Sequence, residues 1–271
     1  MEVRIREKKV KKHIFAICAY KESPYLEECI VSLKNQTVKT DILLATSTPN
    51  EYIENLCKKY DIPMFVNTGE AGITQDWNFA YKMADAEYVT IAHQDDVYHK
   101  KYAEVLLKDT EKAKKPIIFF TDYSEIRDGK KVHDNRLLKI KRLMLLPLRF
   151  NCLQGSRFVR RRILSLGSPI CCPSVTFIKK NCPEKVFEHG FRASEDWQAW
   201  EKLSRLKGSF VYSTMPLTYH RIHQESETSK ILADNARMKE DFIMFCKFWP
   251  EPIAKLLTKF YSSSEKSNDL D

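Results

Sequence analysis

Two adjacent carboxylates, Asp95 and Asp96, follow a run of strand-forming residues in the stretch YVTIAHQDDVYHK (88–100). Like charges side by side repel each other, and burial at the end of a strand would make that repulsion more costly. A divalent cation relieves both problems, because carboxylate oxygens are ligands that suit Mg²⁺ and Mn²⁺. An exposed turn that caps the following helix is the alternative. The pair therefore predicts either a metal site or a solvated turn.

A second acidic pair, Glu195 and Asp196, lies in the segment ASEDWQAWEKL. Ser194 can cap a helix that starts here, and the helix dipole would stabilise both carboxylates in its first turn. This placement alone explains the pair structurally. The functional interpretation makes one of the two carboxylates a general base, held at a helix start that faces a cleft.

Basic side chains gather in a third segment, YHRIHQESETS. Alternation along a strand places Arg221 and His223 on one face, and His220 and Ile222 on the other. Arginine and histidine side chains that point the same way suit a pyrophosphate or a metal ion. A polar loop after an edge strand would explain the same residues.

The hydrophobic pattern indicates which elements position these segments. Between His13 and about Tyr123, short apolar runs alternate with longer stretches of helical periodicity, and the loops between them are short. This alternation is typical of a parallel α/β sheet that is covered by helices. Ligands bind beyond the carboxyl ends of the strands in such sheets, which is where Asp95 and Asp96 lie. Farther along, the Asp-Gly of RDGKK (127–131) predicts a tight hairpin turn.

The charge of the chain is unevenly distributed. Its 271 residues include 45 Lys or Arg and 36 Asp or Glu, for a net charge of +9, and an apolar content of 43% excludes wholesale disorder. No acidic residue occurs between Asn135 and Pro183. The Leu, Phe and Arg of this basic 135–183 region favour an anionic membrane surface or a lipid-diphosphate acceptor as partner. We expect no nucleic acid partner, because no motif for one accompanies the region.

Cysteine usage and apolar run lengths indicate the compartment. The eight cysteines form no CxxC pair and have no histidines at zinc-finger spacing, which favours a reducing environment over a disulfide scaffold. The apolar run from Ile14 to Tyr20 is short for a signal peptide, and no run approaches the roughly 18 residues of a membrane span. We expect a cytoplasmic protein that attaches at most peripherally, at the inner face of the membrane.

In chain order, four segments resemble the inverting, nucleotide-sugar-dependent glycosyltransferases of the GT-A type, glycosyltransferase family 2. FAICAYKESPYLEECIVSLKNQT is similar to the first strand and helix of that family, and AGITQDWNFAYKMADAEYVTIAHQDDVY to the region that leads into its Asp-rich metal motif. SEDWQAW lies where the family keeps its Glu-Asp catalytic pair. YHRIHQES resembles the segment that closes over the diphosphate. The resemblance covers about Lys12 to Ser229.

The resemblance implies a fold and a domain organisation. The fold would be α/β, a GT-A Rossmann-like, mostly parallel central sheet flanked by helices, with a C-terminal helical elaboration. A GT-A domain would span residues 1–229, with a nucleotide-binding half at about 12–125 and an acceptor-binding half at about 126–229. A helical extension with a disordered tail would follow at 230–271.

The resemblance also implies an activity and site residues. The enzyme would transfer a sugar from a nucleotide-diphosphate sugar, with UDP as the favoured nucleotide, to a hydroxyl of a glycan or lipid-linked acceptor. Asp196 would deprotonate that hydroxyl with the support of Glu195. Mn²⁺ or Mg²⁺ would be held by Asp95, Asp96 and His223. The residues implied to bind the nucleotide sugar are Ala19, Tyr20, Glu22, Thr46, Ser47, Asn78, His93, Gln94, Asp95 and Arg221.

Two positions depart from the family pattern and leave other functions open. His93 stands where the Asp-x-Asp motif usually begins, and Thr46 and Ser47 replace carboxylates that usually meet the base or ribose. These changes are compatible with a non-catalytic nucleotide- or glycan-binding relative. A nucleotidyltransferase is the other alternative, although CAYKESPY lacks the glycines of the phosphate loop typical of that class.

Overall fold

The computed structural model describes residues 11–70, 72–223 and 236–266 of the chain. In these residues, nine strands form one sheet in the order β3-β2-β1-β4-β8-β6-β9-β5, with β7 paired to β6. The strands are β1 (Lys11–Ala19), β2 (Asp41–Thr46), β3 (Met64–Val66), β4 (Ala86–His93), β5 (Val97–Tyr98), β6 (Pro116–Arg127), β7 (Lys130–Val132), β8 (Val175–Ile178) and β9 (Ser209–Ile222).

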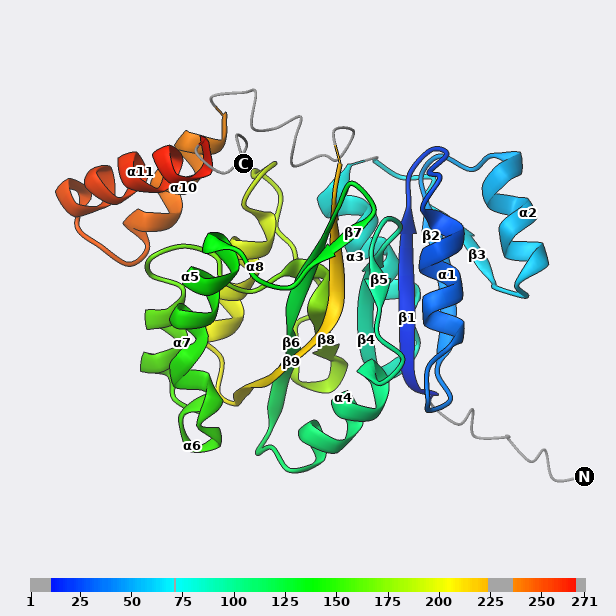
Figure 1. The fold of residues 1–271 in the computed structure, drawn as a ribbon, viewed down its shortest axis with the longest axis horizontal. Coiled ribbons are helices and arrows are strands. Elements are labelled where there is room, and N and C mark those ends of the chain that lie inside the picture. Colours follow the sequence, from blue (N-terminus) through cyan, green and yellow to red (C-terminus); the bar gives the residue numbers. More distant parts are fainter. Residues whose placement is uncertain (1–10, 71, 224–235, 267–271) are drawn as a thin grey trace, which may run out of the picture.

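Helices flank the sheet (Figure 1). The α-helices are α1 (Leu26–Lys34), α2 (Glu51–Lys59), α3 (Ile73–Met83), α4 (Tyr102–Glu111), α5 (Arg136–Leu145), α6 (Asn151–Gln154), α7 (Arg157–Ile163), α8 (Glu195–Ser204), α10 (Ala236–Cys246) and α11 (Glu251–Lys266). Short 3₁₀ helices are η1 (Leu146–Arg149), η2 (Cys172–Ser174) and η3 (Lys179–Asn181). No helix among the described residues has the length and apolar character needed to span a bilayer.

The expected α/β architecture is confirmed, with a sheet that is mixed in its second half. β3, β2, β1 and β4 are parallel to one another, as strand–helix alternation predicts. β8 enters antiparallel between β4 and β6, and β9 then runs parallel to β6. Much of this second half is formed by residues after Tyr123, where strand–helix alternation breaks down. The hydrophobic pattern therefore did not predict the order of these strands.

The sheet separates two apolar cores because β1 presents alternate residues to its two faces. Phe15 and Ile17 pack with residues of α1, α2 and α4, whereas Ile14 and Ala16 pack with residues of α3, α7 and α8. β1 is apolar along most of its length, as expected for a strand that is covered on both sides. A central strand so deeply buried gives a fixed platform for the loops at its carboxyl end.

Helices α10 and α11 contribute buried residues to one of these two apolar cores. Met244 and Phe245 of α10 and Ala254 of α11 are buried in the same cluster as Trp197 of α8. Trp249 Nε1 donates a hydrogen bond to the Ser165 carbonyl at 2.7 Å. Helices α10 and α11 therefore pack against α7 and α8. A disordered tail was expected for the last ten residues, but α11 continues to Lys266, and residues 267–271 lie outside the described residues.

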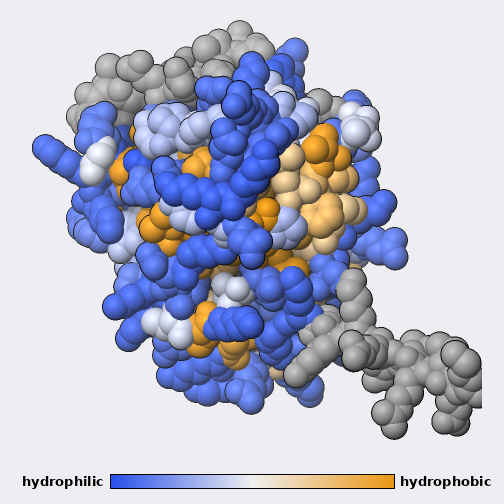
Figure 2. All heavy atoms as spheres, turned by 90° about the vertical axis from the view of Figure 1, so that its right-hand side faces the viewer, coloured by the Kyte–Doolittle hydropathy of each residue, from blue (hydrophilic) through white to orange (hydrophobic). Residues whose placement is uncertain are grey.

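Two local features complete the scaffold. The predicted hairpin turn is confirmed between β6 and β7, where Asp128 (φ 48°) and Gly129 (φ 74°) both adopt the positive φ that a type I′ turn requires. At the opposite end of the sheet, β3 is only three residues long, which limits the unpaired edge. The surface at that end is mostly hydrophilic, with apolar residues in smaller areas between the hydrophilic ones (Figure 2).

Candidate active site

Three candidate metal ligands meet where β4 ends. One ligand atom each from His93, Asp95 and Asp96 lies within 4.8 Å of the others. Asp96 is fully buried, which excludes the solvated turn for this residue. Among the described residues, neither its Oδ2 atom nor His93 Nε2 has a hydrogen-bond partner. A buried carboxylate oxygen without a partner is costly, so this set of side chains fits a divalent cation such as Mn²⁺ or Mg²⁺.

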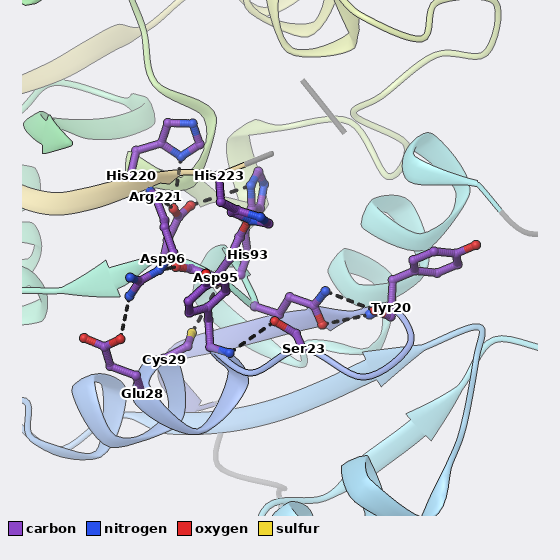
Figure 3. A network of polar contacts seen from close by, with 12 residues as sticks. Tyr20, Ser23, Glu28, Cys29, His93, Asp95, Asp96, His220, Arg221 and His223 are labelled. Carbon is purple, nitrogen blue, oxygen red and sulfur yellow. Dashed lines mark hydrogen bonds and ion pairs between the residues drawn. The ribbon is translucent and has the colours of Figure 1, made fainter. Parts of the chain in front are cut away.

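The end of β9 passes alongside the two aspartates because β9 pairs antiparallel with β5, directly after them (Figure 3). Asp96 Oδ1 accepts the backbone N–H of Arg221 at 2.8 Å and lies 3.0 Å from His220 Nδ1. Asp95 Oδ2 lies 3.0 Å from His223 Nε2. Strand alternation predicts that His220 and His223 point to opposite faces, yet each of them contacts one of the adjacent aspartates.

Arg221 links the turn at Asp95 and Asp96 to helix α1. Its side chain is 7% exposed, and its Nε donates to the Asp95 carbonyl at 2.9 Å. Its Nη2 pairs with Glu28 Oε2 of α1 at 2.5 Å, and its guanidinium lies 4.3 Å from the ring centroid of Tyr25. The ring of Tyr25 also contacts that of His223, at 5.1 Å between centroids. The two segments nearly 200 residues apart thus form one rigid polar network.

Charges in this network differ in a way that suits metal binding. Burial lowers the pKa of His93 despite the nearby carboxylates, so its imidazole is neutral near pH 7 and can act as a ligand. Burial alone would raise the pKa of Asp95, but the hydrogen bond from His223 and the neighbouring imidazoles lower it. Burial likewise opposes protonation of His220, yet the charge and hydrogen bond of Asp96 raise its pKa.

Residues of the first loop adjoin the same turn. The side chain of Gln94 accepts the backbone N–H of Tyr20 and donates to its carbonyl, both at 3.0 Å (Figure 3). The Tyr20 ring is 45% exposed, and Ala19 before it is buried at the end of β1. Glu22 is exposed. Gln94 therefore fixes the backbone of Tyr20, whose ring remains open to a ligand.

The end of β2 lacks the carboxylates of the family pattern, but α3 supplies one nearby. Thr46 is buried, whereas Ser47 Oγ donates to Asp76 Oδ2 at 2.8 Å. Asn67 Nδ2 donates to the other oxygen of Asp76 at 2.7 Å. Asp76 thus holds a negative charge beside the strand end where Thr46 and Ser47 were expected to meet the nucleotide.

Asn78 has a different environment from the other residues expected to bind the nucleotide sugar. Its Oδ1 accepts the backbone N–H groups of Val186 and Phe187, both at 3.1 Å. Its Nδ2 donates to the carbonyls of Thr74 and Phe187 at 2.9 and 2.8 Å. The Asn78 amide therefore fastens the 186–187 segment onto α3.

The second acidic pair begins α8. Burial raises the pKa of Glu195 to about 7, and burial also raises the pKa of Asp196, although the backbone N–H of Trp197 at 2.5 Å opposes that rise. Ser194 occupies the N-cap position, but its hydroxyl donates to Asp241 Oδ1 at 3.2 Å instead of capping the helix. Carboxylates with raised pKa values are suited to proton transfer near neutral pH.

One carboxylate from each acidic pair influences the same buried thiol, that of Cys171. Burial is the main reason for the raised pKa of the Cys171 thiol, and the negative charges of both Asp96 and Asp196 raise it further. Lys141 opposes this effect and donates a hydrogen bond to Tyr123 Oη at 2.9 Å. The general-base candidate and a metal-ligand candidate therefore both lie within electrostatic reach of Cys171.

Several residues of this region were not predicted from the sequence, namely Tyr25, Glu28, Asp76 and Lys141. Asp76 directly precedes the tryptophan of the AGITQDW segment, so a search for carboxylates near the altered β2 end could have found it. Glu28 carried no such signal, because its role depends on the position of Arg221 in the folded chain.

Comparisons with known proteins bear on the family and the fold of the chain. The family model "Glycosyl transferase family 2" matches residues 14–180. A structure of S. aureus TarS (residues 1–349) in complex with UDP-GlcNAc is similar over 91% of this chain and 70% of that chain, with 14% identity and a TM-score of 0.59. A comparison with curated protein sequences gave no significant match.

A second solved structure is that of the mannosyltransferase PcManGT from Pyrobaculum calidifontis in complex with GDP-Man and Mn²⁺. It is similar over 94% of this chain and 70% of that chain, with 13% identity and a TM-score of 0.58. At these identities the two structures establish a shared GT-A fold. The family match, which spans more than half of the sequence, establishes that the chain belongs to glycosyltransferase family 2 and is an enzyme of the glycosyltransferase type.

Proposed function

We propose that this enzyme is an inverting, metal-dependent glycosyltransferase that moves a sugar from a nucleotide-diphosphate sugar to a hydroxyl of a glycan or lipid-linked acceptor. The observation that carries the proposal is the buried Asp96, whose Oδ2 has no hydrogen-bond partner among the described residues, beside His93 and Asp95 at the carboxyl end of β4. The nucleotide sugars in two structures of the same fold, UDP-GlcNAc and GDP-Man, support this class of sugar donor.

Asp95, Asp96 and His93 would hold Mn²⁺ or Mg²⁺. The cation, when bound, supplies positive charge to the diphosphate that leaves the sugar. His223 would keep Asp95 in place through its contact with Oδ2, and it stands next to the three ligands as the fourth candidate. Arg221 would add positive charge at the same turn, while its bonds to Glu28 and to the Asp95 carbonyl keep that charge fixed.

The nucleotide would lie at the carboxyl ends of β1, β2 and β4. Tyr20 offers an exposed ring, and Gln94 holds its backbone. Asp76, held by Ser47 and Asn67, offers a carboxylate to donor groups of the base or ribose. Ala19, Glu22 and Thr46 complete this loop as further candidates.

Asp196 would accept the proton of the acceptor hydroxyl, with Glu195 beside it. An inverting transfer needs a base on the side of the sugar opposite to the leaving diphosphate. Burial raises the pKa of Asp196, which makes its carboxylate a better proton acceptor than an exposed aspartate. The charge of Lys141 acts in the opposite direction and limits this rise in the pKa of Asp196.

The acceptor side of the enzyme has an apolar and basic surface on α5, η1, α6 and α7, which we call the α5–α7 surface. Its exposed apolar residues are Ile140, Leu143, Leu146, Phe150, Phe158 and Leu166. Its exposed basic residues include Arg136, Lys139, Arg149, Arg157 and Arg162. An open apolar cavity of about 270 Å³ lies beside Phe158, between Met144, Pro147 and Leu166.

We propose that the α5–α7 surface binds an anionic membrane that carries the lipid-linked acceptor. Leu143, Phe150 and Phe158 are between 60 and 71% exposed, which water disfavours for side chains of this size. Basic residues around them and the absence of acidic residues between 135 and 183 match an anionic lipid surface.

A panel of UDP- and GDP-sugars tests the proposed reaction. Mn²⁺-dependent release of sugar from one of them is the expected result, and the preferred nucleotide would identify the donor class. Binding without release for every sugar would instead identify a non-catalytic relative. Release from no sugar, with no nucleotide bound, would contradict the proposed function.

A further inference from the structure

A single carboxylate of α10 accepts three consecutive backbone N–H groups just before α8. Glu240 Oε1 accepts the N–H of Arg192 at 2.8 Å, and its Oε2 accepts those of Ala193 and Ser194 at 2.8 and 3.1 Å. The next residue of α10, Asp241, accepts the hydroxyl of Ser194 through Oδ1. The loop that leads into the candidate catalytic pair is thus held by the C-terminal part of the chain.

The hydrogen bonds to Glu240 fix the backbone of residues 192–194, directly before Glu195 and Asp196. Hydrogen bonds from N–H groups to an ionised carboxylate are roughly twice as strong as those between neutral groups. Three of them on successive residues leave 192–194 little freedom, and α8 begins at the next residue, Glu195. The direction in which α8 starts, and with it the position of Asp196, therefore depends on Glu240.

The same helix also packs on the other side of the catalytic pair. Phe245 of α10 contacts Trp197, with 5.1 Å between ring centroids, and both side chains are buried. This apolar contact holds α10 against α8 without any need for carboxylates. Burying the carboxylates of Glu240 and Asp241 costs free energy, and both carboxylates contact the loop before α8.

We propose that Glu240 and Asp241 are positioning residues, through which α10 holds Asp196 in place to take the proton of the acceptor hydroxyl. This inference rests on the proposed function, because the two residues act through Asp196. Burial is the main reason for the raised pKa of Glu195, and the negative charge of Glu240 raises it further. Glu240, whose hydrogen bonds to 192–194 we call the clamp, therefore lies within electrostatic reach of Glu195.

Replacement of Glu240 tests the inference. Glu240→Ala removes all three hydrogen bonds to 192–194, and we expect kcat to fall about 10- to 100-fold, as misplacement of a reacting group does, with the KM for the sugar donor within twofold. Glu240→Gln keeps one oxygen for the two N–H groups of Ala193 and Ser194, so its kcat should lie between those of wild type and Glu240→Ala. Glu251→Gln on α11 makes the same chemical change at an exposed site and should leave kcat unchanged.

Amide hydrogen exchange provides the structural readout. In Glu240→Gln and Glu240→Ala, exchange at 192–194 should become faster, while the core of α8 stays protected. A lower melting temperature with wild-type kcat per folded enzyme would overturn the inference, because it would make the clamp purely structural. If Glu240→Ala does not fold, the kcat of Glu240→Gln decides the question in the same way.

Asp196→Asn in the same assay separates this inference from the proposed function. Loss of transfer in Asp196→Asn with unchanged kcat in both Glu240 variants would overturn only the positioning role. Transfer at the wild-type rate in Asp196→Asn would instead overturn Asp196 as the base, and the positioning role with it.

Discussion

At the scale of single residues, the candidate site holds two pairs of carboxylates in contrasting states. Asp95 keeps a lowered pKa because imidazoles and a hydrogen bond outweigh the effect of its burial. Glu195 and Asp196 have raised pKa values because burial dominates. Asp95 is thereby prepared to help hold a cation, and the second pair to accept a proton, which is how carboxylates take different roles in one enzyme.

Asp196→Asn is the most informative single change in the second pair. Asparagine keeps the oxygen that accepts the Trp197 N–H but cannot take a proton, so transfer should fall by at least about 100-fold. Affinity for the sugar donor, measured by titration with UDP or GDP in the presence of Mn²⁺, should stay within twofold. Equal loss of nucleotide affinity would contradict the assignment of Asp196 as the base.

The raised pKa of Glu195 predicts how folding stability depends on pH. Its pKa is about 7 in the folded chain, above the ordinary value near 4.5, so the stability that Glu195 contributes is fully present below about pH 4.5 and is lost as the pH rises to 7. Glu195→Gln removes this decline. The variant should therefore match wild type near pH 4 and exceed it by up to about 3 kcal/mol at pH 8, measured by urea unfolding.

Glu188→Gln is the control for that measurement, since the hydrogen bond from Lys202 lowers the pKa of Glu188 and its replacement should not stabilise the protein at pH 8. A difference between Glu195→Gln and wild type that is the same at pH 4 and pH 8 would show that the pKa of Glu195 is not raised.

The residues at the site were predictable from the sequence to different degrees. Asp95 and Asp96 follow a recognisable buried strand, so their place at its carboxyl end could be predicted. Their partners could not, because His220 and Arg221 reach them only through the pairing of β5 with β9, 124 to 126 residues away. Asn78 lay in a matched motif, but its amide contacts were set by tertiary packing against 186–187.

At the scale of elements, helix α5 has one side that packs on polar residues of the sheet and another that is exposed and apolar. One side of α5 faces β6 through Lys141 and Arg142, whose side chains bind Tyr123 and Asp122. The other side exposes Leu143, which is 69% accessible. A membrane bound by the α5–α7 surface would therefore lie on the opposite side of α5 from β6.

Vesicle binding tests the α5–α7 surface. Wild-type enzyme should sediment with vesicles that contain phosphatidylglycerol and bind far less to vesicles of phosphatidylcholine alone. Replacing Leu143 and Phe158 with Asp removes apolar contact and adds repulsion, so binding should weaken by at least about tenfold.

Val31→Asp combined with Leu206→Asp is the matched control, since both residues are exposed apolar side chains outside the α5–α7 surface. This variant should bind like wild type. Equal binding of all three proteins, or equal binding to both kinds of vesicle, would contradict the membrane proposal.

Element order was predictable where local patterns suffice. The strand–helix alternation up to Tyr123 and the Asp128-Gly129 turn both appear in the fold as predicted. The position of β8 between β4 and β6 was not predictable, because its antiparallel pairing links it to strands far away in the sequence. The same holds for α10, whose contacts to 192–194 span 46 to 48 residues.

At the scale of the whole molecule, the proposed function divides the sheet, since the parallel half would present the loops for the nucleotide and the second half would bring the candidate base and the acceptor side to them. β9 connects the halves, because it pairs with β6 and β5 and ends on Asp95 and Asp96. The family match ends at residue 180, before α8, β9 and α10. The candidate base, its clamp and the residues that close over the aspartates therefore lie beyond the region that the family model describes.

Chelation tests the central claim most directly. Sugar release from the preferred nucleotide sugar should disappear in EDTA and return with Mn²⁺ or Mg²⁺, and Asp96→Asn should lose at least about 100-fold of this metal-dependent activity, because it removes the charge from the buried ligand. Asp109→Asn, a similar change on α4 away from the β4 turn, should behave like wild type. Full activity after chelation, or unchanged activity in Asp96→Asn, would contradict a metal-dependent transfer at this site.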